Sequence, residues 1–509
     1  MAFVTIKRAM RRTWIDALLI VLVGAAIFAP VSTAYFCGYD DFGETHRAIF
    51  TDAQHPSVIF TTTHFGTTKY RPLNRLSTYF CWMLGRGSAL PFRLRNLSFH
   101  LICALTVYAL ALLLTRERVV ALISGLFFCL EPVANQTVVA AIFTNTTAYA
   151  CLLVGLLAFL LWRQSRRNAW LALSLALVLV GMFFYEPVIV VFAMMAGYLL
   201  LELWRGNSPS RKEALTWLAG SAGAVFVFGV VRHLVVRGEN PPVPLGTILH
   251  NAVLYAGGLL SPVDVVTANQ LFGFPLPPAL HLGRKAFLIL LGAVGAGAAG
   301  LFAYCRTAAV RASLQRLDKG LILFLLMLIP VVLSPFLLFT PHASETYLYL
   351  PAALYAIFLS YLLWGLLPSK PLYWSVVALF LVSFTVGTWI RNQRVVACGQ
   401  IADTILTSLP TAEWRTGDWS IHLFSAPSET PPARYGIYNY RGLSTIDPGD
   451  ADTGNGAQNA LQLITGNPNL KAGLVDPGKT NPSCITPDKC FEVFLNGSVR
   501  QEKSVLSPN

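Results

Sequence analysis

WIDALLIVLVGAAIFAPVSTAYFCGYDDFGETHRAIF (residues 14–50) joins a long apolar run to an acidic pair. The run from Trp14 to Phe36 is long enough to cross a bilayer, at about 1.5 Å per helical residue across roughly 30 Å of hydrocarbon. Basic residues precede this run and many further apolar runs follow it, a pattern that a cleaved signal peptide does not produce. We therefore interpret the run as the first of several transmembrane helices, with the N-terminus in the cytoplasm.

The composition of the whole chain supports this interpretation. Of its 509 residues, 55% are hydrophobic and 12% are charged, whereas soluble domains carry about 25% charged residues. The net charge is +13, but the Lys and Arg residues lie mostly at the ends of apolar runs, as the positive-inside rule expects of short cytoplasmic loops. We therefore predict an integral protein of the inner or plasma membrane that contacts membrane lipids and no nucleic acid.

The apolar runs predict an α-helical polytopic fold with roughly eleven transmembrane helices, at about 20 residues each. These spans are expected near residues 14–36, 96–115, 119–134, 147–162, 169–184, 187–204, 214–236, 285–305, 320–340, 348–367 and 371–390. One orientation then places every short basic loop in the cytoplasm and the long connections 37–95 and 237–284 outside. Within these connections, residues 74–84 predict a helix in the membrane interface, and residues 247–260 a half-buried or re-entrant helix.

The C-terminal part differs in composition from the rest of the chain. Residues 1–391 are predicted to form the membrane domain, and residues 392–509 a small α+β domain outside the membrane. Gly, Pro, Asn and Asp are frequent in its last 110 or so residues, and the alternating runs at 419–424, 435–440 and 490–495 predict strands. Cys484 and Cys490 are close in sequence, so we predict a disulfide between them in an oxidising compartment.

The main candidates for catalysis are Asp40 and Asp41, which closely follow the first span. Adjacent carboxylates repel each other, so the pKa of one of them should rise. Such a group suits a general base for a sugar-acceptor hydroxyl, and we slightly favour Asp41. The pair would also suit a divalent ion or a simple turn, so both alternatives stay open, as does metal dependence. Glu44, in the same loop, is a supporting candidate.

Cations near the predicted outer surface are candidates for binding a phosphate group. Lys69 and Arg71 lie in the segment KYRPL (69–73), and Arg232 ends the predicted seventh span. A guanidinium binds phosphate through two parallel hydrogen bonds, although anchoring to lipid headgroups would also explain these residues. Arg93 and Arg95 lie outside against the charge rule, which also favours an anionic ligand.

Polar residues at the outer ends of later spans complete the candidate site. Ionisable groups at membrane depth are costly and usually functional. Glu186 separates two apolar runs, and His342, Glu345 and Tyr347 lie in the segment HASETYLYLP (342–351). All these groups are predicted to gather at one face of the membrane.

Four segments together resemble the GT-C superfamily of membrane glycosyltransferases. They are YDDFGETHRAIF (39–50), YRPLNRLSTYF (70–80), SETYLYLPAALY (344–355) and RNQRVVACGQIADTILTSLP (391–410). The order and spacing are most similar to the O-mannosyltransferases that carry tetratricopeptide repeats (the TMTC family), and more distantly to protein O-mannosyltransferases. The resemblance implies a polyprenyl-phosphate-linked sugar donor, with mannose as one candidate sugar, an inverting transfer, and a catalytic acidic residue in the first outer loop, at Asp40 or Asp41.

The sequence also departs from this family pattern. Glu131-Pro132 stands where the family has His-Pro, Asn145 where a basic residue is expected, and Thr346 where an Arg follows the Glu. The repeats are absent, and a small unrelated domain follows the last span. The acceptor, which could be a protein, a lipid or a glycan, stays open.

Two other functions compete with glycosyl transfer as explanations of the sequence. A transporter or flippase of lipid-linked glycans would favour internal repeats and helices broken near mid-membrane, and no repeat is evident. A membrane scaffold that presents the C-terminal domain would not need acidic and basic residues collected at one face. The sequence therefore favours a glycosyltransferase.

Overall fold

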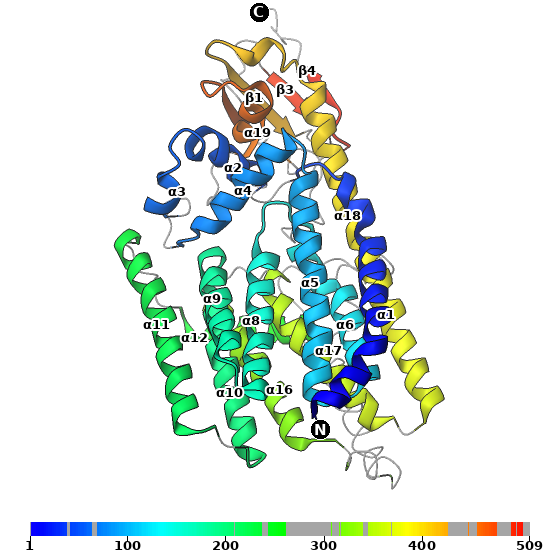
Figure 1. The fold of residues 1–509 in the computed structure, drawn as a ribbon. Coiled ribbons are helices and arrows are strands. Elements are labelled where there is room, and N and C mark those ends of the chain that lie inside the picture. The colour runs from blue at the N-terminus through cyan, green and yellow to red at the C-terminus, as the bar shows by residue number, and fades with distance from the viewer. Residues whose placement is uncertain are drawn as a thin grey trace, which may run out of the picture.

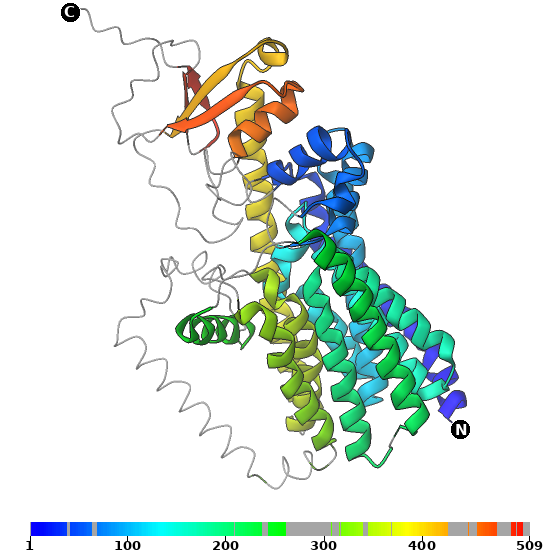
Figure 2. The same cartoon turned by 90° about the vertical axis from the view of Figure 1, so that its left-hand side faces the viewer.

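Long apolar helices packed side by side form the body of the molecule, and a smaller domain covers one end of them (Figures 1 and 2). In this computed structural model, the described residues are 2–37, 41–63, 69–207, 209–236, 243–260, 307, 315, 317–338, 345–367, 369–425, 446, 456–475, 490–494 and 496–501. Within them, eight helices are long and apolar enough to cross a membrane, and a bent helix pair raises the number to nine. The chain is thus an integral membrane protein.

The helices of this bundle correspond to the predicted apolar runs. They are α1 (Ala2–Phe28), α5 (Leu90–Thr115), α6 (Arg118–Leu130), α8 (Asn145–Ser165), α9 (Asn168–Phe184), α10 (Val191–Trp204), α11 (Arg211–Val235), α16 (Lys319–Leu337), α17 (Tyr349–Leu366) and α18 (Lys370–Ser408). Short 3₁₀ turns precede or follow several of them: η1 (Ala29–Thr33), η5 (Glu186–Val190) and η6 (Glu345–Leu348). The predicted span at 285–305 lies outside the described residues, so the number eleven stays a prediction.

One predicted span differs in shape from the prediction. Residues 119–134 were expected to form a continuous span, but α6 ends at Leu130 and is followed by η4 (Pro132–Ala134) and α7 (Asn135–Val139), at an angle of 50°. Pro132 cannot donate a backbone hydrogen bond, and it biases the residue before it toward extended backbone. Glu131 has that conformation, with φ −60° and ψ 117°. The Glu-Pro pair therefore breaks the helix.

The loop after α1 folds into helices that lie against the end of the bundle. It contains α2 (Asp41–Arg47), the π-helical turn η2 (Ala48–Asp52), α3 (Val58–Thr61) and α4 (Pro72–Gly85). The predicted interfacial helix at 74–84 corresponds to α4. The apolar segment at 247–260 forms α12 (Leu245–Leu260), which is too short to count among the spanning helices.

The C-terminal domain contains a four-stranded sheet. Its elements are η7 (Glu413–Arg415), β1 (Ser420–Ser425), α19 (Gly456–Thr465), β2 (Lys471–Val475), β3 (Cys490–Val493) and β4 (Val499–Gln501). The strand order is β2-β1-β3-β4, with β1 parallel to β2 and β3, and β4 antiparallel to β3. The predicted strands at 419–424 and 490–495 correspond to β1 and β3, whereas 435–440 lies outside the described residues. The domain lies at the end of the bundle opposite the N-terminus (Figure 1).

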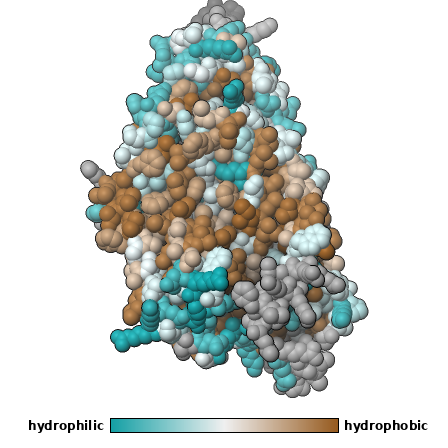
Figure 3. Space-filling view, in the orientation of Figure 1, coloured by the Kyte–Doolittle hydropathy of each residue, from teal (hydrophilic) through white to brown (hydrophobic). Residues whose placement is uncertain are grey.

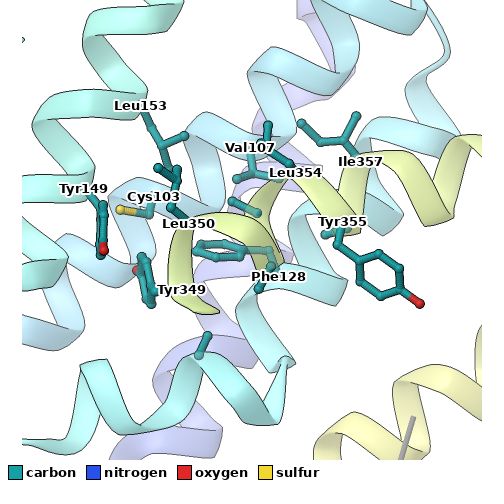
Figure 4. Packing of buried hydrophobic residues seen from close by; sticks show 14 of the residues in the cluster. Cys103, Val107, Phe128, Tyr149, Leu153, Tyr349, Leu350, Leu354, Tyr355 and Ile357 are labelled. Carbon is teal, nitrogen blue, oxygen red and sulfur yellow. The ribbon is translucent and has the colours of Figure 1, made fainter. Parts of the chain in front are cut away.

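Hydrophobic packing holds these parts together. Figure 3 shows a brown band of apolar surface across the visible face of the bundle, as a lipid-facing surface requires. Inside, the aromatic and aliphatic side chains of α5, α6, α8 and α17 form one core (Figure 4). A second core joins the loop after α1 to the C-terminal domain: it contains Phe36 and Phe42 together with Trp414, Leu461 and Phe491.

Candidate functional site

Arg71 and Glu186 form an ion pair at the end of the bundle that carries the C-terminal domain. Arg71 Nε donates to Glu186 Oε2 at 2.7 Å, and the backbone N–H of Tyr70 donates to Glu186 Oε1 at 2.7 Å. Arg71 is the N-cap of α4, and Glu186 begins η5 directly after α9. Burial lowers the pKa of Arg71 and the Glu186 carboxylate raises it, with a net upward shift. The guanidinium is therefore a permanent cation held in one orientation.

Aromatic rings surround this cation. The Arg71 guanidinium lies over the ring of Tyr185, 4.5 Å from its centroid, a cation–π contact. Tyr185 stacks on Phe336, and Phe336 stacks on Tyr347 with centroids 4.7 Å apart. On its other side Tyr185 meets the edge of Tyr149. The predicted site residues Arg71, Glu186 and Tyr347 thus come together in one cluster.

The cluster continues into the core of the bundle. Tyr149 of α8 stacks on Tyr349 of α17, with centroids 5.2 Å apart and an angle of 13° (Figure 4). Nδ1 of His100 lies 2.8 Å from the Tyr349 hydroxyl, and its Nε2 lies 3.1 Å from the carbonyl oxygen of Cys129. These buried hydrogen bonds fix the first residue of α17 against α5 and thereby fix the wall of the site.

An apolar groove with a volume of about 670 Å³ lies next in the chain to the residues of the Arg71 cluster, and Arg95 is the cation in its own lining. Side chains of α4, α5, α8 and α9 line it: Leu73, Leu76, Ser77, Phe80, Cys81, Leu84, Leu90, Pro91, Leu94, Arg95, Ser98, Phe99, Thr147 and Phe184. Leu73 is two residues from Arg71, and Phe184 directly precedes Tyr185, so the groove reaches the junction that holds the cation. Phe80 and Leu84 are 55% and 79% exposed, which makes the other end of the groove accessible from the surface.

Asp41 occupies a buried position at the start of α2. Its carboxylate accepts hydrogen bonds from the backbone N–H of Cys37 at 3.1 Å and of Ile142 at 3.4 Å. It is only 2% exposed, and burial raises its pKa from 3.8 to about 6, against the lowering effects of Arg93, the two backbone donors and Arg95. The predicted rise in the pKa of one member of the acidic pair thus has burial as its main cause.

Arg93 and Arg95, the two arginines predicted outside against the charge rule, anchor the segments around Asp41. Arg95 donates to the carbonyl oxygens of Ala141 and Phe143 at 2.8 and 3.0 Å. These bonds orient the intervening residue, Ile142, whose backbone N–H donates to Asp41. Arg93 donates to the carbonyl oxygen of Tyr35 at 2.9 Å. Its Nε and Nη1 are buried and make no hydrogen bond to the described residues. Arg93 therefore acts on Asp41 mainly through its charge.

Glu345 belongs to a second ion pair rather than to the Arg71 cluster. Both of its carboxylate oxygens accept from the terminal nitrogens of Arg391, one of them at 2.9 Å. Arg391 lies in α18, where its side chain is fully buried, while the Glu345 side chain is 30% exposed. The pair ties η6, which also carries Tyr347, to the long C-terminal helix.

Asp52 and Arg75 form a buried ion pair inside the loop after α1. The Arg75 Nε and Nη2 atoms both donate to the Asp52 carboxylate, the first at 3.1 Å. Arg75 Nη1 also donates to the Val58 carbonyl and the Thr62 hydroxyl, each at 2.8 Å. All three guanidinium nitrogens of Arg75 are thus engaged within the loop, so the pair stabilises the loop.

The remaining candidates are placed less specifically. Glu44 is buried in α2, and Lys69 directly precedes Tyr70 at the edge of the Arg71 cluster. Arg232 is in the last turn of α11, four residues after Phe228, whose ring packs against Phe183 with centroids 5.4 Å apart. Residues four apart share a helix face, so Arg232 lies on the side of α11 that faces α9.

Three predicted residues, Asp40, His342 and Cys484, lie outside the described part of the chain. Cys490 is disulfide-bonded, while its pairing with Cys484 stays a prediction. Among the described residues, no group of three or more His, Cys, Asp or Glu side chains is arranged to hold a metal ion.

Sequence reasoning did not identify Tyr185, Tyr149 or Arg391 as parts of the site. Tyr185 and Tyr149 look like ordinary aromatic residues at the ends of apolar runs. Arg391 directly follows the last predicted span, and a cation next to an apolar run at the outer end is itself a signal, as Arg93 is before the second span.

Comparisons with known proteins give weak similarities. No family model and no curated protein matches the sequence. The solved structure of ArnT from Cupriavidus metallidurans bound to undecaprenyl phosphate aligns at 16% identity over 84% of each chain, with a TM-score of 0.37. The oligosaccharyltransferase of Archaeoglobus fulgidus in its apo form aligns at 12% identity over 81% of this chain and 62% of that chain, with a TM-score of 0.46.

Proposed function

We propose that the chain is a GT-C-type glycosyltransferase that moves a sugar from a polyprenyl-phosphate donor to an acceptor at the outer face of the membrane. One observation carries the proposal: a fixed guanidinium, Arg71, lies where an apolar groove reaches the end of the bundle that bears the acidic loop. A donor of this kind needs both features, because its phosphate is anionic and its prenyl chain is apolar. The four sequence segments that resemble GT-C enzymes support the same reading.

Arg71 is suited to bind the donor phosphate. Glu186 engages only its Nε, and the two terminal nitrogens make no hydrogen bond to the described residues. The side chain is 14% exposed, so a ligand can reach it. Those two nitrogens can donate in parallel to two phosphate oxygens. The prenyl chain would then lie along Leu73, Phe80 and Phe184 in the groove, where burial of apolar surface adds affinity.

The transfer itself needs a base for the acceptor hydroxyl. The hydroxyl oxygen attacks the anomeric carbon, the bond from that carbon to the phosphate oxygen breaks, and polyprenyl phosphate leaves with the electron pair. Because Asp41 is buried and both its oxygens already accept backbone hydrogen bonds, we assign proton abstraction to Asp40, in place of the slight preference for Asp41. Asp41 then holds the adjacent backbone in position. The single transfer inverts the anomeric carbon.

Purified full-length protein in lipid nanodiscs provides the test. We expect release of polyprenyl phosphate from a matching polyprenyl-phosphate hexose, with Asp40→Asn reducing turnover by about a hundred- to ten-thousand-fold. Asp41→Asn should fold and retain more activity than Asp40→Asn. If both variants fold and turn over at the wild-type rate, the proposed mechanism is wrong.

The phosphate site is tested separately by donor binding. Arg71→Lys keeps the charge but loses the planar fork, so donor affinity should fall. Arg86→Lys is the matched control, because Arg86 is exposed at the other end of α4. Unchanged donor affinity in Arg71→Ala would show that Arg71 is only a headgroup anchor.

A transporter or flippase of lipid-linked glycans is the second candidate function. The observation that favours it is the broken helix at Glu131-Pro132, since transporters use discontinuous helices at their binding sites. Movement of a fluorescent polyprenyl-phosphate sugar across vesicles, with no release of polyprenyl phosphate, would support this function over glycosyl transfer.

A further inference from the structure

The C-terminal domain contacts the acidic loop directly. Its helix α19 packs on α2, the helix that begins at Asp41 (Figure 1). All of residues 41–45 are buried. Since the domain is joined to the membrane part by α18, it returns over the end of the bundle to reach α2. The helix that begins at Asp41 therefore lies between the bundle and the C-terminal domain.

The contact is part of a continuous hydrophobic core. Phe42, the residue after Asp41, is 3% exposed and belongs to the same core as Ala460 and Leu461 of α19, which are fully buried. Trp414 and Phe491 extend this core into the domain. A loose docking between independent domains would leave these side chains accessible. The domain and α2 instead share one interior.

Two polar side chains lie at the same contact. His46, in the last turn of α2, approaches Gln462 of α19, and its buried Nε2 makes no hydrogen bond to the described residues. Gln462 is held rigidly, since its amide nitrogen donates to the carbonyl oxygens of Pro468 at 2.8 Å and Leu470 at 2.7 Å. Burial lowers the pKa of His46 and Gln462 raises it, with a net downward shift, so the imidazole is neutral near pH 7. On its other side His46 packs on Phe50, with ring centroids 4.6 Å apart.

A helix as short as α2 depends on such contacts. It has seven residues, and helices of that length are unstable in water without tertiary packing. Its start is fixed by the Asp41 carboxylate on the amides of Cys37 and Ile142. At its other end Arg47 donates to the Thr63 carbonyl oxygen at 2.8 Å, within the same loop, and the helix packs against α19. Since the Arg47 contact stays inside the loop, α19 is the contact that relates this end of α2 to the C-terminal domain.

We propose that the C-terminal domain is the positioning element of the acidic pair: α19 seats α2, with His46 and Gln462 as positioning residues. This inference rests on the proposed function, because it assigns the pair a task that requires accurate placement. A displacement of 1 Å at a reacting group can cost on the order of a hundredfold in rate. The domain is thereby part of the catalytic unit, although none of its residues needs to touch the donor.

The test uses full-length protein with His46→Ala, with His46→Gln as the conservative variant. His55→Ala is the matched control, since His55 is an exposed histidine of the same loop. We expect kcat to fall by about tenfold or more in His46→Ala, because a misplacement of less than 1 Å at a reacting group has an effect of about this size. In His46→Gln, kcat should recover substantially. The donor KM and the number of donor-binding sites should not change, because Arg71 and Glu186 lie on other elements.

Hydrogen–deuterium exchange supplies a readout that does not need activity. The amides of α2 should exchange faster in His46→Ala than in the wild type or in His55→Ala, while those of α4 and α9 should not change. Unchanged exchange in α2, or a kcat that equals the wild-type value, would overturn the proposal. So would a loss of donor-binding sites equal to the loss of kcat, which would indicate general misfolding.

The two proposals can fail separately. If the wild type transfers no sugar from any polyprenyl-phosphate donor, the proposed function fails. The exchange measurement still decides whether α19 seats α2.

Discussion

The substitution Asp41→Asn tests how burial of the Asp41 carboxylate affects the stability of the folded protein. It separates the cost of burying the charge from the gain of the hydrogen bonds that the carboxylate accepts. Asp41 is 2% exposed, and burial raises its pKa from 3.8 to about 6. The groups that face it are Arg93 and Arg95 from α5, Cys398 from α18, and the amides of Cys37 and Ile142. The two arginines and the amides favour the ionised form, yet burial outweighs them.

The raised pKa has a definite sign for stability. The folded protein binds the Asp41 proton more tightly than the unfolded chain does, so ionisation favours unfolding. The stabilisation that comes from protonated Asp41 is fully present below about pH 4 and is lost as pH rises to about 6. The difference between 3.8 and about 6, at about 1.4 kcal/mol per pKa unit, amounts to roughly 3 kcal/mol.

An asparagine at this position cannot ionise and avoids that loss. It keeps one of the two oxygens that accept backbone hydrogen bonds, so it gives up one bond, at about 1 kcal/mol, at every pH. We therefore expect Asp41→Asn to be less stable than the wild type by about 1 kcal/mol near pH 4 and more stable by roughly 2 kcal/mol near pH 7.5. The sign of the difference should reverse between these conditions.

Thermal unfolding in detergent at both pH values measures this reversal. Asp418→Asn is the control, because Asp418 is an exposed residue of the C-terminal domain, and it should show no reversal. If Asp41→Asn is destabilised by the same amount at pH 4 and pH 7.5, the carboxylate is only a hydrogen-bond acceptor and the reasoning from burial is wrong.

Three further predictions concern the frame around the site. Asp52→Asn leaves the buried Arg75 guanidinium without its counter-charge, and should lower the free energy of unfolding by about 3–5 kcal/mol, measured by chemical denaturation against the wild type. Cys484 and Cys490 should be recovered as one disulfide-linked peptide in unreduced mass spectrometry, and two free thiols would contradict an oxidising location. Reporter fusions at Gly206 and within the C-terminal domain should report opposite sides of the membrane, and a shared side would refute the predicted topology.

The sequence predicted the bundle well because lipid imposes a simple requirement on it. A spanning helix needs a minimum length of apolar residues, and short cytoplasmic loops collect cations, so the positions of the helices follow from local composition. The break at Glu131 was missed because a hydropathy average hides a single Pro. The extension of α18 beyond residue 390 was missed because Arg391 and Asn392 end the apolar run, although both are buried in the helix.

The sequence indicated at which end of the bundle the candidate residues lie, but not which of them form ion pairs with each other. Arg71, Glu186 and Glu345 were all expected at one end of the bundle, and the charge bias of the loops is sufficient for that expectation. The choice of partner depends on how helices far apart in sequence pack: Arg71 and Glu186 are 115 positions apart, and Glu345 pairs with Arg391, 46 positions away. No local pattern in one sequence specifies such a choice.

The arginines at this end of the molecule can be ranked by the hydrogen bonds that their structure leaves unused. Arg75 and Arg95 engage all three guanidinium nitrogens within the protein, and Arg391 engages both terminal nitrogens with one carboxylate. Arg93 has two nitrogens that bind none of the described residues, but it is only 3% exposed. Arg71 combines terminal nitrogens that bind none of those residues with a side chain that is still 14% exposed. A phosphate needs both terminal nitrogens that are unused and a path to them. Of the five arginines compared, Arg71 meets both requirements, which is why the proposed donor phosphate is assigned to it.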